Sequence, residues 1–352
     1  MRAAGLETAV FSPPGAPDRP SVVGSLPPAG GGASAGGTQP LMLNAHYDTV
    51  GVDEMEAPFE PRIEGERLHG RGGYDMKGAL AACIEAAAML TDAEQRPPAG
   101  LVVAAVSDEE NESLGTADLL RRRDLGELHF GAAIVTEPTS LKLCVAHRGF
   151  VWIEVTVHGR AAHGSRYLLG DDANIRMGRV LGELETLRDR LQSQAGHPLL
   201  GPPSLHAATV HGGTGLSTYS ARCVLNIERR TVPPETVEGV ESEIDRLLEG
   251  LRAEDPSLRT SRRTLFSREP FETSPDAPVV RCLRRAAKRV LGVAPEVTGD
   301  SPWMDSALTQ AAGVDSVVMG PSGSGAHAEV EWVDIGSCVL LARVLAETAL
   351  RW

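Results

Sequence analysis

Apolar residues along the chain form short continuous runs that alternate with stretches of helical periodicity. The runs lie at 41–43, 101–106, 132–135 and 314–319, and the helical patterns lie at 77–90, 113–123, 278–291 and 334–350. A strand that is apolar throughout is buried on both faces, as in a parallel sheet between layers of helices. The pattern therefore predicts an α/β domain with a mainly parallel sheet.

The middle of the chain has a different pattern, in which apolar and polar residues alternate. The alternation occurs at 150–157 and 223–227, and helical patterns occur at about 173–192 and 236–251. Alternation predicts strands with one face exposed to solvent. Two helices with roughly four such strands indicate a ferredoxin-like α+β sandwich. We therefore predict an α+β domain at 149–266, inserted between the two parts of the α/β domain at 1–148 and 267–352.

Composition and charge exclude several classes of function. The net charge of −13 argues against nucleic acid or an anionic membrane as a partner. No apolar run approaches the roughly 20 residues that span a bilayer, and the N-terminal segment lacks the pattern of a secretory signal. The five cysteines are scattered without a CxxC pair, which favours free thiols in a reducing cytoplasm. We expect a cytoplasmic protein with a small-molecule substrate.

Side chains that can bind metal ions follow the apolar runs, and one more precedes a helix in the segment GRGGYDMKG. These residues are His46, Asp48, Asp75, Glu109, Glu110, Glu137 and His327. Ligands of open α/β sheets bind beyond the carboxyl ends of the strands. We therefore expect these side chains to meet at one edge of the sheet.

The residue types at this edge suit a catalytic metal site. Imidazole and carboxylate without thiolate suit zinc, cobalt or manganese in an open coordination. One ligand from each of the four strand ends and Asp75 make five, which are too many for one tetrahedral ion and about right for two ions that share a ligand. Two ions roughly 3.5–4 Å apart can polarise a carbonyl and activate a water molecule. Glu109, next to Glu110, is placed to accept the proton of that water.

Each of these motifs also has an ordinary structural interpretation. A histidine with a nearby aspartate is usually a loop pair, a Glu-Glu pair is usually solvated surface, and a glycine-rich loop usually marks a turn. Their occurrence together, at successive strand ends, favours the metal site.

Five sequence stretches resemble a family of zinc-dependent amidohydrolases and metallopeptidases. They are LNAHYDTV (43–50), HGRGGYDMKGALAA (69–82), SDEENESLGT (107–116), IVTEPT (134–139) and GPSGSGAHAEVEWV (320–333). The family contains acetylornithine deacetylase, succinyl-diaminopimelate desuccinylase, aminoacylase-1 and glutamate carboxypeptidase. The resemblance covers nearly the whole chain, and it implies that the α/β domain is catalytic.

The resemblance implies which residues bind the two metal ions. One ion would be bound by His46 and Glu137. The other would be bound by Glu110 and His327. Asp75 would bridge the two ions.

The resemblance also implies roles for residues beside the ligands. Asp48 would orient His46, as outer carboxylates commonly do for ligand histidines. Glu109 would be the general base and later the proton donor to the leaving amine. A cis peptide bond is expected between Asp75 and Met76.

The inserted domain has its own implied roles. In the family it mediates dimers and supplies a histidine that stabilises the oxyanion in the partner's active site. The segment GRAAHGS (159–165) places His163 in that role. Arg230 and Arg268 are candidates to bind a substrate carboxylate, for which a planar guanidinium is well suited. Each is equally consistent with an ordinary surface arginine.

The sequence therefore predicts a two-metal hydrolase that cleaves the amide bond of an N-acyl amino acid. The resemblance of residues 211–235 to deacetylase-like members favours a deacylase, and so does Glu137, because family aminopeptidases tend to have Asp there. A metallocarboxypeptidase or dipeptidase is the alternative within the family. The alternative from another class is a binding protein that retains the metals without turnover.

Overall fold

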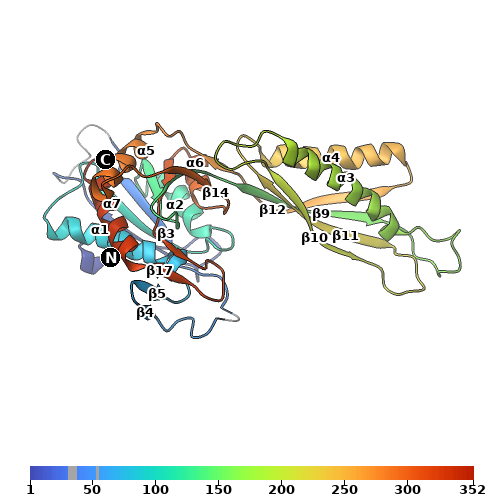
Figure 1. Ribbon diagram of the computed structural model, residues 1–352, viewed down its shortest axis with the longest axis horizontal. Coiled ribbons are helices and arrows are strands. Elements are labelled where there is room, and N and C mark those ends of the chain that lie inside the picture. The colour runs from blue at the N-terminus through green and yellow to red at the C-terminus, as the bar shows by residue number, and fades with distance from the viewer. Residues whose placement is uncertain (31–37, 53–54) are drawn as a thin grey trace. The chain divides into compact units, whose positions relative to one another are not determined.

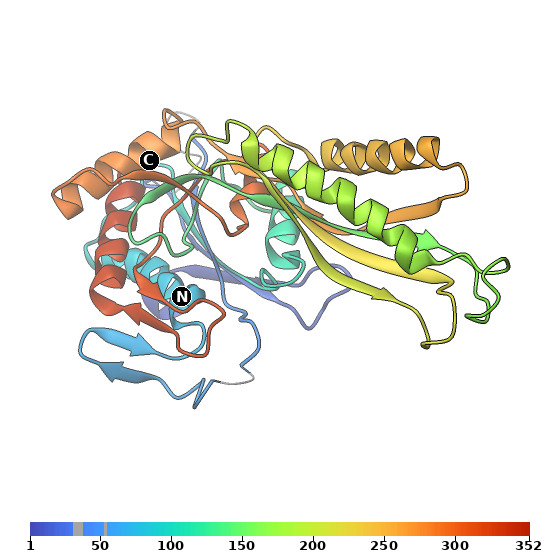
Figure 2. The ribbon, with the colours of Figure 1, turned by 45° about the vertical axis from the view of Figure 1, so that its right-hand side comes forward.

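The computed structural model describes residues 1–30, 38–52 and 55–352 (Figures 1 and 2). The chain divides into two compact units. Unit 1 comprises Met1–Val145, Thr273–Thr298 and Met304–Trp352, and unit 2 comprises Ala146–Glu272 and Gly299–Trp303. The boundaries at 149 and 266 that the sequence indicates for an inserted domain stay a prediction.

A mixed sheet forms the centre of unit 1, and its middle strands are parallel. The strands, in spatial order, are β1 (Glu7–Phe11), β2 (Ser21–Leu26), β6 (Leu101–Val106), β3 (Leu41–His46), β7 (Ala132–Val135), β15 (Asp315–Val318) and β8 (Leu143–His147). Strands β6, β3, β7 and β15 run parallel to one another. Two short strands, β13 (Phe271–Glu272) and β14 (Val297–Asp300), pair with β8. All of β13 and the last two residues of β8 and of β14 belong to unit 2. The prediction of a mainly parallel α/β sheet is confirmed.

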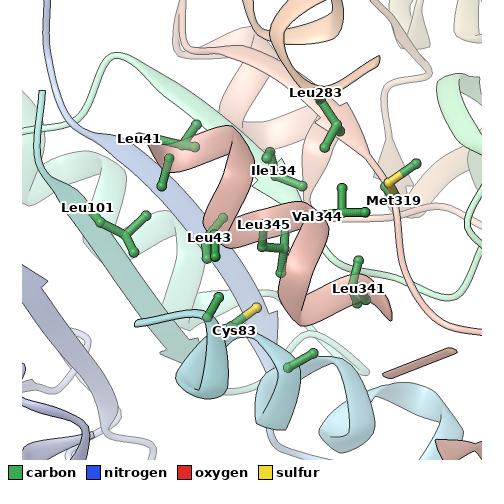
Figure 3. Packing of buried hydrophobic residues seen from close by; sticks show 14 of the residues in the cluster. Leu41, Leu43, Cys83, Leu101, Ile134, Leu283, Met319, Leu341, Val344 and Leu345 are labelled. Atoms are coloured by element: carbon green, nitrogen blue, oxygen red, sulfur yellow. The ribbon is translucent and has the colours of Figure 1, made fainter. Parts of the chain in front are cut away.

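Helices cover both faces of this sheet. They are α1 (Gly78–Asp92), α2 (Leu114–Asp124), α5 (Pro278–Leu291), α6 (Ser306–Ala311) and α7 (Ile335–Ala349). Leu41 and Leu43 of β3 pack in one core with α1, α5 and α7, which Figure 3 shows from close by. Met42, between them, packs in a second core with α2 and α6. Successive strand side chains point to opposite faces, so one apolar run fills both cores.

A small antiparallel sheet in unit 1 supports two loops of the candidate site. Its strands, in order, are β16 (Gly323–Ser324), β17 (Trp332–Asp334), β5 (Arg67–His69) and β4 (Arg62–Glu64). Strand β5 leads towards the turn η2 (Gly73–Lys77), and the connection from β16 to β17 carries His327. Strands of two or three residues are too short to produce an alternating pattern, so the sequence does not predict this sheet.

Unit 2 is a four-stranded antiparallel sheet with two helices packed on it. The strands, in spatial order, are β10 (Ser204–Gly212), β11 (Arg222–Thr231), β9 (Gly149–His158) and β12 (Arg259–Arg268), and the helices are α3 (Ala173–Ser193) and α4 (Val237–Glu254). The chain order βαββαβ is ferredoxin-like. Val151, Ile153 and Val155 of β9 face the helices in one core, as the alternating pattern predicts. Each helix begins at a capping side chain, Asp172 or Thr236.

The helices predicted from periodicity agree with the structure to within a few residues. The pattern at 278–291 coincides with α5, and the pattern at 173–192 corresponds to α3. The six-residue helix α6 is not predicted, because it is too short for a periodic signal. No helix among the described residues has both the length and the apolar character needed to cross a membrane.

Candidate metal centre

Three of the predicted ligands lie at the carboxyl ends of parallel strands. His46 is the last residue of β3, Glu137 lies just after β7, and Glu110 lies in the loop after β6. Because β3 pairs in parallel with both β6 and β7, the three strand ends lie side by side at one edge of the sheet. Asp75 and His327 reach this edge from segments next to the small sheet.

Asp75 lies between the two histidines. Its Oδ1 atom is 3.0 Å from Nε2 of His46, and its Oδ2 atom is 3.3 Å from Nε2 of His327. Oε1 of Glu137 lies 3.5 Å from Nε2 of His46, and Oε2 of Glu110 lies 3.1 Å from Nε2 of His327. The ligand atoms therefore form two groups of three that share Asp75, and the atoms of each group lie within 4.8 Å of one another.

The backbone that presents Asp75 is tightly constrained. Gly72, at the start of η2, has a φ of 79°, and a Cβ atom there would lie 2.6 Å from Nζ of Lys77 and 2.7 Å from Cγ2 of Thr49. A residue with a side chain would therefore meet both strain and steric overlap at this position. The peptide bond between Asp75 and Met76 is cis, as the family resemblance implies.

The carboxylates and imidazoles of this cluster shift one another's pKa. Burial alone would lower the pKa of His46, but the surrounding carboxylates, Glu137 foremost, raise it well above its usual value. Hydrogen bonds with Asp75 and Glu110 raise the pKa of His327 to about 10. Burial raises the pKa of Glu137 to about 8. In the metal-free protein, protons thus supply the positive charge that the carboxylates require.

Glu109 lies next to the ligand Glu110 but belongs to neither group of three. Burial raises the pKa of Glu109 well above its usual value, and the charges of Glu137 and Asp305 raise it further. A carboxyl group with a raised pKa can accept a proton near neutral pH and donate it again. The arrangement therefore suits general acid–base chemistry.

The donor set fits two divalent cations. Three carboxylates and two imidazoles, without thiolate, match the ligand preferences of zinc, cobalt and manganese. Oε1 of Glu110 is buried and has no hydrogen-bond partner among the described residues. An unpaired buried carboxylate oxygen is costly unless a cation or a donor satisfies it. This orphaned oxygen therefore supports a bound cation.

Asp48 contacts His46 on the side opposite Asp75. Nδ1 of His46 lies 3.0 Å from the backbone oxygen of Asp48 and 3.6 Å from its Oδ1 atom. The closer contact is to the carbonyl oxygen, whereas the sequence interpretation expects the carboxylate to orient the ring. With Nδ1 held by either oxygen, Nε2 faces the cluster. Oδ2 of Asp48 accepts the backbone N–H of Glu110 at 3.2 Å.

Three buried polar residues, Asn44, Thr116 and Asp305, form a hydrogen-bonded chain that the residue pattern does not predict. Asp305, at the start of α6, accepts a hydrogen bond of 2.5 Å from Oγ1 of Thr116. The same Oγ1 accepts a hydrogen bond of 3.0 Å from Nδ2 of Asn44. Burial raises the pKa of Asp305 to about 6. The one available signal is Asn44 itself, a polar residue in the otherwise apolar start of LMLNAH.

A second set that the sequence interpretation misses comprises Arg71 and Glu331, both buried. Both residues lie inside motifs of the family resemblance, yet neither has a side chain that the pattern assigns to the metals. A charged residue between apolar neighbours, as in EVEWV, is the signal that indicates a buried role for Glu331.

Three of the predicted site residues belong to unit 2, whereas the candidate ligands belong to unit 1. His163 is exposed, in the segment between β9 and α3. Arg230 forms an ion pair of 2.9 Å with Glu228. The guanidinium of Arg268 lies over the ring of Trp303, 5.0 Å from its centroid. The roles of these three residues, like those of the ligands and Glu109, stay predictions.

Comparison with known protein families identifies the family of this chain. The model of Peptidase family M20/M25/M40 matches residues 42–351, a range that includes all five candidate ligands. The chain belongs to this family. The family resemblance that the five motifs indicate is therefore confirmed.

Curated members of the M20/M25/M40 family are similar to the chain over part of their length. Acetylornithine deacetylase of Vibrio atlanticus is 33% identical over 230 residues, which are 64% of this chain and 59% of the relative. Acetylornithine deacetylase of Aliivibrio fischeri is 29% identical over 255 residues, which are 71% of this chain and 65% of the relative. The chain thus spans about three fifths of the length of the curated relatives it matches.

Solved structures of other proteins share the fold. A tripeptidase of Staphylococcus aureus superposes with a TM-score of 0.77 at 17% identity, covering 99% of this chain and 89% of that one. An M20 family metallo-carboxypeptidase of Sulfolobus solfataricus superposes with a TM-score of 0.76 at 18% identity, covering 98% and 90%. At this level of identity the likeness concerns the fold alone.

Proposed function

We propose that this protein is a two-metal hydrolase that cleaves the amide bond of an N-acyl amino acid, as an acetylornithine deacetylase-like deacylase. The observation that carries the proposal is the position of Asp75, which is shared by two groups of metal-binding side chains. Membership of Peptidase family M20/M25/M40 and similarity to curated acetylornithine deacetylases support it.

Five side chains would hold the metal ions. His46 and Glu137 would bind one ion, and Asp75 would be shared. Glu110 and His327 would bind the second ion. We propose zinc for both, with cobalt or manganese as alternatives that the same donor set accepts. When bound, the ions supply Lewis acidity that polarises the scissile carbonyl and lowers the pKa of a water molecule.

Glu109 would move the proton. In this proposal its carboxylate accepts a proton from the attacking water and then donates it to the leaving amine. The burial that raises the pKa of Glu109 supports this, because a general base works best with a pKa near the operating pH. Asp48, through its contact with Nδ1 of His46, would hold that imidazole with Nε2 towards the metal.

The substrate would be a small amino-acid-like molecule with a carboxylate. Arg230 and Arg268 are the proposed partners of that carboxylate, because a guanidinium can bind it through two parallel hydrogen bonds. Both lie in unit 2 beside aromatic rings. Residue 137 is a glutamate, whereas aminopeptidases of the family tend to have an aspartate at this position. This difference also supports a deacylase.

A metallocarboxypeptidase or dipeptidase is the second candidate. It is favoured by the matching family model, which is that of Peptidase family M20/M25/M40. The same residues would serve either reaction, because both break an amide bond by attack of water.

We further propose a homodimer, in which His163 of one protomer would stabilise the oxyanion in the site of the other. Strand β10 is an edge strand of the unit 2 sheet, and Val210 on it is 47% exposed. An exposed edge strand offers unpaired backbone groups to a second copy. A monomeric sedimentation profile at micromolar concentration contradicts a role for His163 across the dimer.

We also propose that the protein acts in the cytoplasm on small molecules, without a nucleic-acid or membrane partner. The net charge of −13 supports the absence of such partners, because an acidic protein is repelled by phosphate backbones and anionic lipid headgroups.

The proposed function is tested by measuring metal content together with hydrolysis of N-acyl amino acids and dipeptides, with and without added zinc or cobalt. Metal-dependent release of amine from the N-acyl substrates supports the deacylase, and release from dipeptides alone supports the peptidase. Two bound ions without turnover on either class indicate a binding protein that retains the metals. A protein that binds neither metal contradicts the proposal.

A further inference from the structure

The carboxylate of Glu331 lies against the turn that carries Asp75. Its Oε1 atom accepts the backbone N–H groups of Tyr74 at 2.9 Å and Asp75 at 3.0 Å. Its Oε2 atom accepts the backbone N–H of Gly72 at 3.1 Å. Glu331 is only 2% exposed, so water does not compete for these bonds. Three backbone donors thus converge on one buried carboxylate, and such charge-assisted bonds are stronger than neutral ones.

Arg71 completes the arrangement around this carboxylate. Its Nη1 atom donates to Oε2 of Glu331 at 2.7 Å, and its Nη2 atom donates to the backbone oxygen of Ala328 at 2.9 Å. The side chains of Arg71 and Glu331 are 5% and 1% exposed. A buried ion pair contributes little net stability on average, because both charges lose their hydration. Its effect here is geometric, since it joins the Asp75 turn to the residue after His327.

The small sheet brings these two segments together. Trp332 of β17 pairs with His69 of β5, and the backbone N–H of Gly70 donates to the backbone oxygen of Glu331 at 3.2 Å. The β16–β17 connection therefore carries His327 in its loop and Glu331 next to the pairing with β5. One short pairing of strands thus aligns the two segments that supply Asp75 and His327.

We propose that Glu331, neutralised by Arg71, is a positioning residue that fixes the Asp75 carboxylate between the two metal sites and holds the His327 loop beside it. The direction of the Asp75 side chain follows from the backbone of η2, and Glu331 binds the N–H of Asp75 itself. Without that anchor the turn can rotate, and one carboxylate oxygen no longer faces each histidine. The inference rests on the proposed function, in which the segments that carry Asp75 and His327 supply ligands to bound metal ions.

The test compares Glu331→Gln with Glu329→Gln, an exposed glutamate of the same loop. The first variant keeps the side-chain volume but removes the charge, and its amide NH₂ cannot accept an N–H. Titration of the metal-free proteins with Co²⁺, followed by visible absorption and calorimetry, measures the affinities and the coordination spectrum. Hydrogen exchange of the metal-free proteins measures the mobility of residues 70–77 and 325–331.

We expect wild type and Glu329→Gln to bind two Co²⁺ ions with the same spectrum. In Glu331→Gln we expect about 10–100-fold weaker binding, as for loss of outer partners of metal ligands, with an altered Co²⁺ spectrum. Exchange is expected to accelerate at 70–77 and 325–331 and to stay unchanged in unit 2. Arg71→Lys keeps the positive charge but not the two-pronged contact, and we expect a smaller change in the same direction.

Wild-type affinity, spectrum and local exchange in Glu331→Gln overturn the positioning role. A variant that exchanges rapidly in every segment also overturns it, because it assigns Glu331 a general structural role. If Glu331→Gln does not fold, the same measurements on Arg71→Lys test the proposal. Wild-type Co²⁺ affinity, spectrum and local exchange in Arg71→Lys then overturn the positioning role of Glu331. If wild type itself binds neither Co²⁺ nor Zn²⁺, the proposed function fails, and local acceleration of exchange in metal-free Glu331→Gln still supports the anchor.

Discussion

Oδ1 of Asp75 lies 3.0 Å from Nε2 of His46, and this contact defines the chemistry of the cluster. The imidazole of His46 is buried and its Nδ1 atom faces the backbone oxygen of Asp48, so Nε2 can point only towards the carboxylates. In the metal-free protein a proton on His46 balances their charge, which is why its pKa is raised well above the usual value. A divalent cation at the same place would replace that proton.

Asp75→Asn is expected to disrupt both metal sites at once. An amide presents only one acceptor oxygen, whereas the two carboxylate oxygens of Asp75 face different histidines. We expect fewer than two bound ions per chain and a fall in kcat/KM of at least about a hundredfold. Metal analysis of the purified variant and steady-state kinetics measure this. Asp124→Asn, an exposed change at the end of α2, is the control, and equal losses in both variants contradict a bridging role.

Glu109→Gln is expected to reduce turnover without loss of metal. The amide cannot accept a proton, and Glu109 belongs to neither ligand group. We expect kcat to fall by about 10²–10⁴-fold, with two ions still bound. Glu112→Gln, an exposed change in the same loop, is expected to keep wild-type kcat. Near wild-type turnover in Glu109→Gln removes it as the general base.

The stability of the metal-free protein is expected to fall as pH rises from about 6 to about 9. The pKa of Glu137 is raised to about 8 by burial, so its contribution is present below its unfolded pKa and is lost as pH rises through 8. The pKa of His327 is raised to about 10 by its hydrogen bonds, and its contribution is lost as pH rises through 10. Thermal unfolding at pH 6 and pH 9 measures the change.

Added metal is expected to reverse this trend, because it competes with the same protons. Calorimetry in buffers of different ionisation enthalpy measures proton release, and we expect metal binding at pH 7 to release protons from the cluster of His46, His327 and Glu137. In Glu137→Gln the fall in stability between pH 6 and pH 9 is expected to be smaller. Metal binding without proton release is inconsistent with the charge state derived from these pKa shifts.

The arrangement of strands and helices is largely predictable from the sequence, because burial leaves a periodic trace. The run at 101–106 is apolar at every position because both faces of β6 are covered. The alternation at 150–157 reflects a strand of unit 2 with one covered face. The small sheet leaves no such trace, since its strands have only two or three residues.

The candidate ligands are predictable because their chemistry is visible in the residue type and in the position at a strand end. The anchor of the Asp75 turn is not, since Glu331 binds backbone N–H groups, which every residue except proline carries. The closest partner of His46 at Nδ1 is likewise a backbone group, the carbonyl oxygen of Asp48, and residue types alone do not indicate that contact. Side chains that recognise backbone leave no complementary residue in the sequence.

Thr116→Val is expected to destabilise the protein by about 1–3 kcal/mol, because it leaves buried polar groups without partners. Oγ1 of Thr116 donates to Asp305 and accepts from Asn44, and valine can do neither. Urea unfolding measures the loss. Thr186→Val, on the exposed surface of α3, is the control and is expected to stay within about 0.5 kcal/mol of wild type. Equal stability of the two variants shows that the buried chain contributes nothing.

Gly320→Ala is expected to weaken metal binding through the backbone of Glu137. A Cβ atom at Gly320 would lie 2.2 Å from the backbone oxygen of Glu137 and 2.4 Å from that of Thr136. Neither atom belongs to a flexible side chain, so the strand end that presents Glu137 must shift. Displacement of a ligand by a few tenths of an ångström is significant for a metal site, whose ligand distances are fixed within about 0.2 Å.

We expect Gly320→Ala to bind the ion at His46 and Glu137 at least about tenfold more weakly, as measured by calorimetric titration with Co²⁺. Gly178→Ala is the matched control, because a Cβ atom there, within α3, meets open space. That change is expected to leave metal binding unaltered and to stabilise the helix by about 0.5–1 kcal/mol. If both alanine variants bind two ions with wild-type affinity, the backbone of Glu137 tolerates the added methyl group. The close contact at Gly320 then has no role in holding the metal ligand.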